Sequence, residues 1–320
     1  MVVSKFGQYV LLQVHDESGQ LVFETDSLKI DFDIMHIKGW SRAKISLTNL
    51  SPDTIRKLGD ANNGNYVSIS TALHDSEPSL IADRMYVSNA LEEIKIPESI
   101  FSMYCYSKLR KLYLEKQIDL QVEAPSLRSM VSRATEAAGF SGEVEYKYFP
   151  PDILNYIPPQ PHSRLQGSLI SVLEVLGGYY KFNVYTEGDK LVFMYKPDDK
   201  NVRQTSFYSA AGDIQLATSN MRSNPKIGPA TLSVVSNLDP HIKPTAILDI
   251  SELLTLGTDT NEETLQVAED YLKDKVSGFS KYQALSVQHK GSNWTGDWVT
   301  QVAGTSPTVG TSMPSNKWWL

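Results

Sequence analysis

A strict alternation of apolar and polar residues is the feature that most constrains how this chain can fold. In LKIDFDI, residues 28–34, the even positions are apolar, whereas Lys29, Asp31 and Asp33 fill the odd ones. RAKISLTNL, residues 42–50, repeats the pattern. A period of two places successive side chains on opposite faces of a β-strand. Both segments are therefore predicted strands with one buried face and one polar face.

Strand patterns continue through residues 1–122, and one short helix interrupts them. The turn DESGQ, between two apolar runs, predicts a hairpin. In SPDTIRKLG, Ser51 suits a helix N-cap, Pro52 the first helical position and Gly59 the end of the helix. Five or more antiparallel strands around one helix predict a β-barrel or sandwich.

The pattern changes to a small α+β domain at residues 123–203. A first helix ends at Gly139 and a second, SLISVLEVLGG, ends at Gly177, and a hairpin follows. The segment GEVEYKYFPPDILNYIPPQPH, residues 142–162, is rich in proline and tyrosine and is expected to be extended and irregular. The apolar positions at helical spacing in the first helix are Leu127, Met130, Val131, Ala134 and Ala138.

Strand signals return in a second β-domain, residues 204–304. Strands are predicted at TLSVVS, at TAILDIS and on both sides of a turn in KYQALSVQHKGSNWTGDWVTQVAG. Residues 261–276 are predicted to be a loop with a helical piece, and the tail 305–320 lacks periodicity. The expected fold class is mainly β, with two β-domains flanking an α+β domain.

Composition limits the classes of function. The chain has 320 residues, of which 41% are hydrophobic, and its net charge is −7. A packed core is therefore expected, and a dedicated binder of nucleic acid or of anionic membranes is not. No apolar run approaches the ~20 residues of a membrane span, so no membrane insertion is expected. Cys105 is the single cysteine, which excludes an intrachain disulfide.

Catalytic and metal-binding motifs are missing from the sequence. It contains no G-x-S-x-G, P-loop, G-x-G-x-x-G or H-E-x-x-H pattern, and its histidines lack partners at ligand-like spacing. His36 is expected in a turn, solvated or hydrogen-bonded locally. We therefore expect neither an enzyme nor a cofactor or metal site.

One stretch, HKGSNWTGDWVTQVAG at 289–304, nevertheless resembles a site. His289 and Asp297 could form a catalytic pair. Trp294 and Trp298 could form a stacking platform for a glycan. The structural alternative, which the sequence favours, is a β-hairpin whose turn is KGSNWTGD and whose tryptophans pack.

The segment PSNKWWL, residues 314–320, is also unusual. Exposing Trp318, Trp319 and Leu320 to water is costly. The segment is expected either to fold back on its own domain or to dock on a neighbouring subunit, because aromatic anchors are favoured at interfaces. These three residues are the interface-anchor candidates.

The segment KISLTNLSPDTIRKL, residues 44–58, resembles the first tube-like domain of bacteriophage tail baseplate hub proteins. The preceding LKIDFDIMHIKGW is similar to the paired strand and turn of that domain. The order of domains also matches over about residues 5–304. The resemblance implies two tube-like antiparallel β-barrel domains flanking the α+β domain. Late control D proteins and the core of the type VI secretion VgrG spike are related to this family.

What the resemblance implies about function is structural. Such hubs are homotrimers that form a pseudo-sixfold ring, which adapts the hexameric tail tube to the trimeric spike. The implied partners are the tail tube or tube-initiator protein, the central spike protein and the tape measure protein, with phage DNA passing through without specific binding. The implied location is the virion tail baseplate, assembled in the host cytoplasm. No appended lysozyme domain fits the chain length.

The polar face of the strand at 28–34 suits the wall of a water-filled lumen. We therefore take Asp31 and Asp33 as lumen-lining candidates in a net negative lumen that repels DNA and lets it pass. The alternative function is a receptor- or glycan-binding tail module, which would rest on Trp294 and Trp298.

Overall fold

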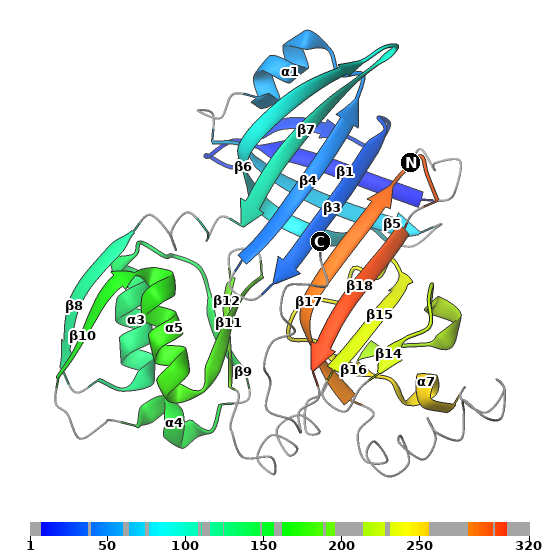
Figure 1. Cartoon of the computed structure of the whole chain (residues 1–320). Coiled ribbons are helices and arrows are strands. Elements are labelled where there is room, and N and C mark those ends of the chain that lie inside the picture. Colours follow the sequence, from blue (N-terminus) through cyan, green and yellow to red (C-terminus); the bar gives the residue numbers. More distant parts are fainter. Residues whose placement is uncertain are drawn as a thin grey trace. The chain divides into compact units, whose positions relative to one another are not determined.

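The chain divides into two compact units, the first formed by residues 1–195 and 288–299 and the second by 196–287 and 300–320. Figure 1 shows the computed structural model. It describes residues 8–37, 40–59, 64–73, 77–107, 110, 116–123, 125–147, 149–156, 162–187, 190–195, 214–227, 231–255, 281–296 and 298–305.

The N-terminal part of the first unit is a large antiparallel sheet. Its strands follow the order β3-β4-β7-β6-β5-β1-β2, and β17 (Lys281–Ser292) is the other neighbour of β3. The strands of this sheet are β1 (Gln8–His15), β2 (Leu21–Thr25), β3 (Ile30–Ile37), β4 (Trp40–Thr48), β5 (Tyr66–Leu73), β6 (Ser79–Lys95) and β7 (Glu98–Ser107).

The predicted alternation governs the two central strands. Ile30, Phe32 and Ile34 of β3 are buried, whereas Asp31 and Asp33 are only partly so. The register pairs Ile30 with Leu47, Phe32 with Ile45 and Ile34 with Ala43, and these partners on β4 are buried as well. Both predicted strands are confirmed, including the face that each one buries.

The helix predicted directly after β4 is α1 (Pro52–Gly59). The hydroxyl of Ser51 accepts a hydrogen bond from the backbone N–H of Thr54 at 3.2 Å, as an N-cap should. Leu58 is its buried anchor, at 1% exposure. The local signals therefore placed both ends of this helix correctly.

The closed barrels expected for the two β-domains are wrong for the described residues, because the strands of both lie on one open path. The strand path is open, with β2 at one edge, and the free side of β3 is taken by β17 rather than by β2. The strand β2 has only 5 residues and pairs with β1 alone. The mainly β, antiparallel character of the prediction is confirmed.

The α+β part packs helices α3 and α5 with two small sheets, of order β10-β8 and β11-β12-β9. All five apolar positions predicted for the first helix are buried, and Ser126 caps its N-terminus. The elements are β8 (Gln117–Glu123), α3 (Leu127–Ala137), β9 (Val144–Lys147), α4 (Pro151–Asn155), β10 (His162–Ser168), α5 (Leu169–Tyr180), β11 (Phe182–Glu187) and β12 (Lys190–Tyr195).

Three features of this part differ from the sequence prediction. The segment expected to be irregular contains β9 and α4, because β9 gains a parallel partner in β12. The helix α5 continues past Gly177 to Tyr180, and Lys181 ends it in the left-handed conformation with φ 57°. The strand β8 pairs with β10, and Ile118 and Val122 join the α+β core although they precede the predicted boundary at 122/123.

The second unit contains β13 to β16, residues 281–287 of β17 and residues 300–305 of β18. The strand β15 pairs with β14 and β18, β17 pairs with β18 and β16, and β16 pairs with β13. The predicted helical piece at 261–276 lies outside the described residues. The elements are β13 (Ile214–Gln215), the 3-10 helix η2 (Thr218–Asn220), β14 (Lys226–Ile227), β15 (Thr231–Asn237), β16 (Ile247–Asp249), α7 (Ser251–Thr255) and β18 (Trp298–Thr305).

Candidate functional site

The face of the N-terminal sheet opposite its core carries the two carboxylates singled out from the sequence. Asp31 lies opposite Ser46, and Asp33 lies opposite Lys44, on the neighbouring strand β4. Lys44 in turn lies opposite Tyr104 on the next strand, β7, and the Nζ atom of Lys44 lies 5.7 Å from the centre of the Tyr104 ring. Asp31 and Asp33 therefore belong to a mixed polar surface that continues across the strands.

The carboxylate of Asp33 is tied to β17. The Nε2 atom of Gln288 donates to Oδ1 of Asp33 at 2.6 Å, and Nζ of Lys290 lies 3.6 Å from Oδ2. The side chains of Lys290 and Asp33 are 42% and 43% exposed, so this ion pair contributes no more than about 1 kcal/mol. Its clearer effect is to offset the charge of Asp33 locally.

This surface has no excess of negative charge. Lys44 lies opposite Asp33, Lys290 pairs with Asp33, and Arg42 is exposed further along β4, so this face carries cations as well as the two carboxylates. The prediction of an acidic wall considered only the charged residues of β3. Arg42 and Lys44 occupy the polar positions of the RAKIS alternation, so their contribution was available from the sequence.

An exposed hairpin arm, formed by residues 94–99 at the ends of β6 and β7 and in the turn between them, was not anticipated. Beyond the last pair that β7 makes with β4, Thr48 with Ile100, the ends of β6 and β7 pair with each other. Figure 1 shows this hairpin at the top of the sheet. Ile94 is 74% exposed and Ile96 is 93% exposed. The sequence signal was the run LEEIKIPESI, in which apolar and charged residues alternate around a proline.

The stretch 289–304 forms the predicted hairpin, but its turn is shorter than predicted, because Lys290, Gly291 and Ser292 still belong to β17. Trp298 is buried, at 2% exposure, and its indole N–H donates to the carbonyl of Ser292 at 2.6 Å. Its ring meets Phe32 edge to face, with the ring centres 6.1 Å apart. Trp294, by contrast, is 60% exposed. The two tryptophans therefore do not form a common platform for a glycan.

The histidine of this stretch is buried as well. His289 is 1% exposed, and its ring lies edge to face with His36, with the ring centres 5.8 Å apart. The proposed catalytic partner Asp297 lies outside the described residues. His36 lies in β3 rather than in a turn, and its ring nitrogens hydrogen-bond the Ser41 hydroxyl at 2.9 Å and the Ile81 carbonyl at 3.1 Å. Its predicted local hydrogen bonding is confirmed.

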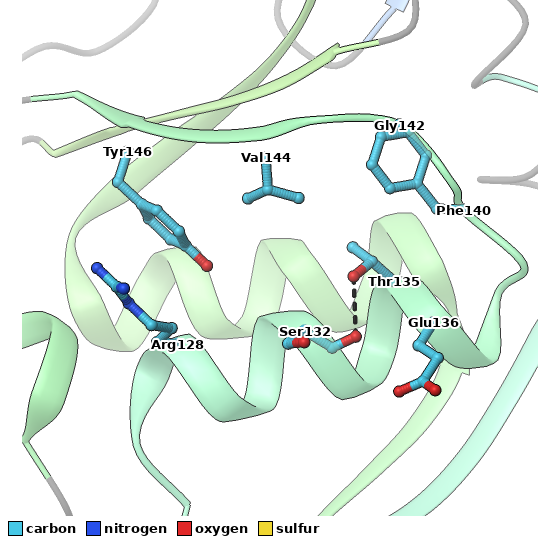
Figure 2. A pocket seen from close by; sticks show the side chains of 8 residues that line it. All are labelled: Arg128, Ser132, Thr135, Glu136, Phe140, Gly142, Val144 and Tyr146. Carbon is cyan, nitrogen blue, oxygen red and sulfur yellow. Dashed lines mark hydrogen bonds between the residues drawn. The ribbon is translucent and has the colours of Figure 1, made fainter.

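A shallow groove of about 360 Å³ lies between α3 and β9 in the α+β part. Figure 2 shows Arg128, Ser132 and Glu136 along the helix on one side, and Val144 and Tyr146 of β9 on the other. The groove is also lined by Thr135, Phe140 and Gly142. It thus combines an aromatic and aliphatic floor with a cation near one end and a carboxylate near the other.

The cationic end of the groove is organised around Tyr146. The guanidinium of Arg128 lies 5.6 Å from the centre of the Tyr146 ring, within the range of a cation–π contact. Burial raises the pKa of the Tyr146 hydroxyl to about 12, although the positive charge of Arg128 acts in the opposite direction. Tyr146 is therefore a neutral hydrogen-bonding group at physiological pH.

The other sequence candidates give no further site. Trp318, Trp319 and Leu320 lie outside the described residues. Burial raises the pKa of the Cys105 thiol, as expected for an inert core cysteine. Within the described ranges, His, Cys, Asp and Glu residues form no cluster of three or more that could hold a metal ion. No described helix has the length and apolar character needed to cross a membrane.

Comparison with solved structures identifies the architecture. The 43 kDa tail protein of prophage MuSo2 from Shewanella oneidensis matches with a TM-score of 0.55 at 10% identity, over 94% of this chain and 98% of that one. A tail protein from Neisseria meningitidis MC58 matches with a TM-score of 0.56 at 9% identity, over 92% and 96%. The fold is that of phage tail proteins.

The likeness extends to type VI secretion. An E. coli component of that system, described as structurally similar to T4 bacteriophage tail proteins gp27 and gp5, matches with a TM-score of 0.50 at 10% identity, over 88% of this chain and 74% of that one. No family model and no curated protein matches the sequence. The predicted resemblance to hub-like tail proteins is thus confirmed at the level of the fold.

Proposed function

We propose that this chain is the central baseplate hub of a phage-type tail. In this role it is a structural protein without catalytic activity, and three copies form a ring that adapts the hexameric tail tube to the trimeric spike. The observation that carries the proposal is the match in fold to two solved tail proteins, which spans more than nine-tenths of each chain. The match to a protein described as similar to gp27 and gp5 supports a place beside a spike.

The partners follow from this role. They are the tail tube or tube-initiator protein on one side, the central spike protein on the other, and the tape measure protein in the lumen before ejection. We place the hub in the virion baseplate after assembly in the host cytoplasm. Phage DNA passes through the ring without being bound specifically.

The polar face that carries Asp31 and Asp33 is the proposed lumen wall. It suits a passage for DNA because charges of both signs are interspersed on it, and a strongly basic wall would hold the phosphate backbone. Lys44 and Lys290 lie beside Asp33 and offset its charge. Cryo-electron microscopy of the ring tests this placement, which fails if β3 and β4 turn this face outward.

The exposed hairpin arm is the proposed contact between copies. Large apolar side chains that protrude in this way are typical of association surfaces. We expect purified wild-type protein to give the mass of a trimer by light scattering, and rings with a central hole on the grid. The double variant Ile94→Asp, Ile96→Asp should be monomeric.

A matched control variant distinguishes loss of the contact between copies from a general effect of an added surface charge on solubility or folding. Leu21 is another exposed apolar residue, 46% exposed on β2, so Leu21→Asp should leave the trimer intact. A wild-type chain that stays monomeric even with the spike protein present would refute the ring. Trimers that survive the double substitution would remove the arm from the interface.

Glycan binding is the weaker candidate, because Trp294 is exposed whereas Trp298 is buried. We expect purified protein to bind no cell-wall polysaccharide and to release no fragments from peptidoglycan. Binding that is lost in Trp294→Ala would favour the receptor-binding module instead.

A further inference from the structure

The groove between α3 and β9 lies beside a strand that, among the described residues, is at the edge of its sheet. The strand β9 is at one end of the order β11-β12-β9, and Val144 and Tyr146 on it line the groove. The backbone carbonyl of Glu143 accepts from Leu191 of β12. Because successive residues of a strand point their backbone groups to alternate sides, those of Val144 and Tyr146 face away from β12. This edge can therefore accept another strand.

The helix supplies the second wall. Arg128, Ser132 and Glu136 are four residues apart and exposed, so they form one stripe about 12 Å long. A helix beside an open strand edge is the geometry in which extended peptides bind by β-addition. The volume of about 360 Å³ lies at the lower end of the range for ligand pockets, which leaves room for one large side chain above Val144 and Tyr146.

The chemistry of the groove selects an occupant with one cation and one aromatic ring. At one end is the exposed side chain of Glu136 on α3, and Phe140 lines the same groove. At the other end the Arg128 guanidinium lies over Tyr146 and can receive a second ring on its outer side. A lysine and a tryptophan that share one face of a strand would satisfy both ends.

The segment PSNKWWL, residues 314–320, has this pattern. Lys317 and Trp319 are two residues apart, so in an extended chain they point the same way and lie about 7 Å apart. Val144 and Tyr146 have the same spacing on β9. The residues between Thr305, the last described one, and Pro314 can span about 30 Å, so the segment is not confined to the neighbourhood of Thr305.

We infer that residues 314–320 of a neighbouring copy add to β9 as a parallel strand. Trp319 lies level with Tyr146 and packs against Arg128, Lys317 lies level with Val144 and pairs with Glu136, and Ser315 lies level with Gly142. Such a contact joins two different surfaces of identical chains, so repetition can close a ring. The inference does not rest on the proposed hub function, because the groove and the segment are features of this chain whatever it assembles into.

The first test measures binding of the segment itself. The acceptor is the full-length chain carrying Trp318→Ala and Trp319→Ala, which removes its own anchor. The probe is a fluorescein-labelled peptide of residues 311–320, followed by anisotropy. We expect saturable binding, with slower hydrogen exchange at Val144 and Tyr146. A Trp319→Ala peptide should bind at least ~10-fold more weakly, as expected for an aromatic anchor.

Exchanging the charges of Glu136 and Lys317 tests whether the peptide binds in the proposed position. Glu136→Lys in the acceptor should weaken binding by ~2- to 5-fold, the range of an exposed ion pair, and a Lys317→Glu peptide should restore it. Glu174, exposed on α5, is the matched control, and Glu174→Lys should change nothing. Absence of saturable binding, or equal binding by the Trp319→Ala peptide, would overturn the inference.

The second test asks whether the contact joins two copies. One full-length chain carries Gly142→Cys and another carries Ser315→Cys, and the two are mixed under mild oxidation. The native Cys105 is buried and adds little background. We expect a covalent dimer on a denaturing gel, and none when Gly178→Cys replaces Gly142→Cys, because Gly178 is exposed on α5. No cross-link to position 142 would overturn the inference. Failure of either test would not refute the hub proposal, because that proposal is tested separately by the mass of the assembled ring.

Discussion

Gly291 and Phe32 approach each other so closely that no side chain fits between them. A Cβ atom at position 291 would lie 2.6 Å from Cζ of the Phe32 ring. Phe32 is 4% exposed and also packs edge to face with Trp298. This close approach lets a strand from near the end of the sequence lie against β3.

Gly291→Ala should therefore destabilise the first unit. The added methyl group must displace a buried aromatic ring, and overpacking of this kind costs about 1–3 kcal/mol. Denaturant unfolding monitored by tryptophan fluorescence measures the change. Gly296→Ala is the matched control, since a Cβ there meets nothing within 4 Å. Equal stability of the two variants would contradict the proposed close packing.

The two tryptophans of the same hairpin should respond in opposite ways to truncation. Trp298→Ala removes a buried ring and leaves a cavity, so we expect a loss of about 3–5 kcal/mol in the free energy of unfolding. Trp294→Ala should change stability by less than about 0.5 kcal/mol, because its side chain is largely in water. Calorimetry of both variants checks the contrast, and a large loss at Trp294 would be unexpected.

The N-cap of α3 should contribute measurably to the α+β part. The Ser126 hydroxyl accepts from the backbone N–H of Ser129 at 3.2 Å. Ser126→Ala should cost about 1 kcal/mol, the usual value for losing such a cap. Ser132→Ala lies on the exposed side of the same helix and should be neutral or slightly stabilising. If both variants unfold at the same denaturant concentration, the cap has no effect.

An ion pair across β8 and β10 sets a pH dependence. Arg164 donates to both oxygens of Asp119, at 2.9 Å and 2.8 Å, which lowers the pKa of this carboxyl below its ordinary 3.8. Because the folded pKa is the lower one, its stabilising contribution is complete above the ordinary pKa. It is lost as the pH falls through the lowered value.

This pH dependence can be observed at a single carbon. Titration of the Asp119 carboxyl carbon by NMR should give a pKa below 3.8, and Arg164→Gln should move it back toward that value. Both groups are exposed, so the effect on overall stability should be small. An unchanged pKa in the variant would mean that the pair does not persist in solution.

Local periodicity in the sequence predicted the helices and strands well wherever an element buries only one of its faces. The strand β3 and the helix α3 bury the residues that their periods of two and 3.6 select. Pairings between distant segments could not be predicted in this way. Nothing local to β9 indicates its parallel partner β12, and nothing near Leu28 or Ile30 indicates their hydrogen bonds to Asn293. Register over such separations depends on tertiary packing rather than on propensity.

The candidate site shows the same limit. The alternation correctly placed Asp31 and Asp33 on the polar face of β3. The net charge of that face depends on which strands lie alongside, and the pairing with β4 and β17 brings Lys44 and Lys290 to the carboxylates. The groove between α3 and β9 could likewise not be predicted from the sequence, because only the tertiary fold brings its two walls together.

Residues 288–292 of β17 lie beside β3, although the strands β1 to β7 on the other side are all made by residue 107. While the ribosome adds the intervening residues, the N-terminal sheet has an open edge at β3 and an incompletely covered Phe32. Exposed edges of this kind favour pairing with other chains. The nascent protein is therefore prone to aggregation until β17 has been made, and chains released before residue 288 should depend on chaperones for solubility.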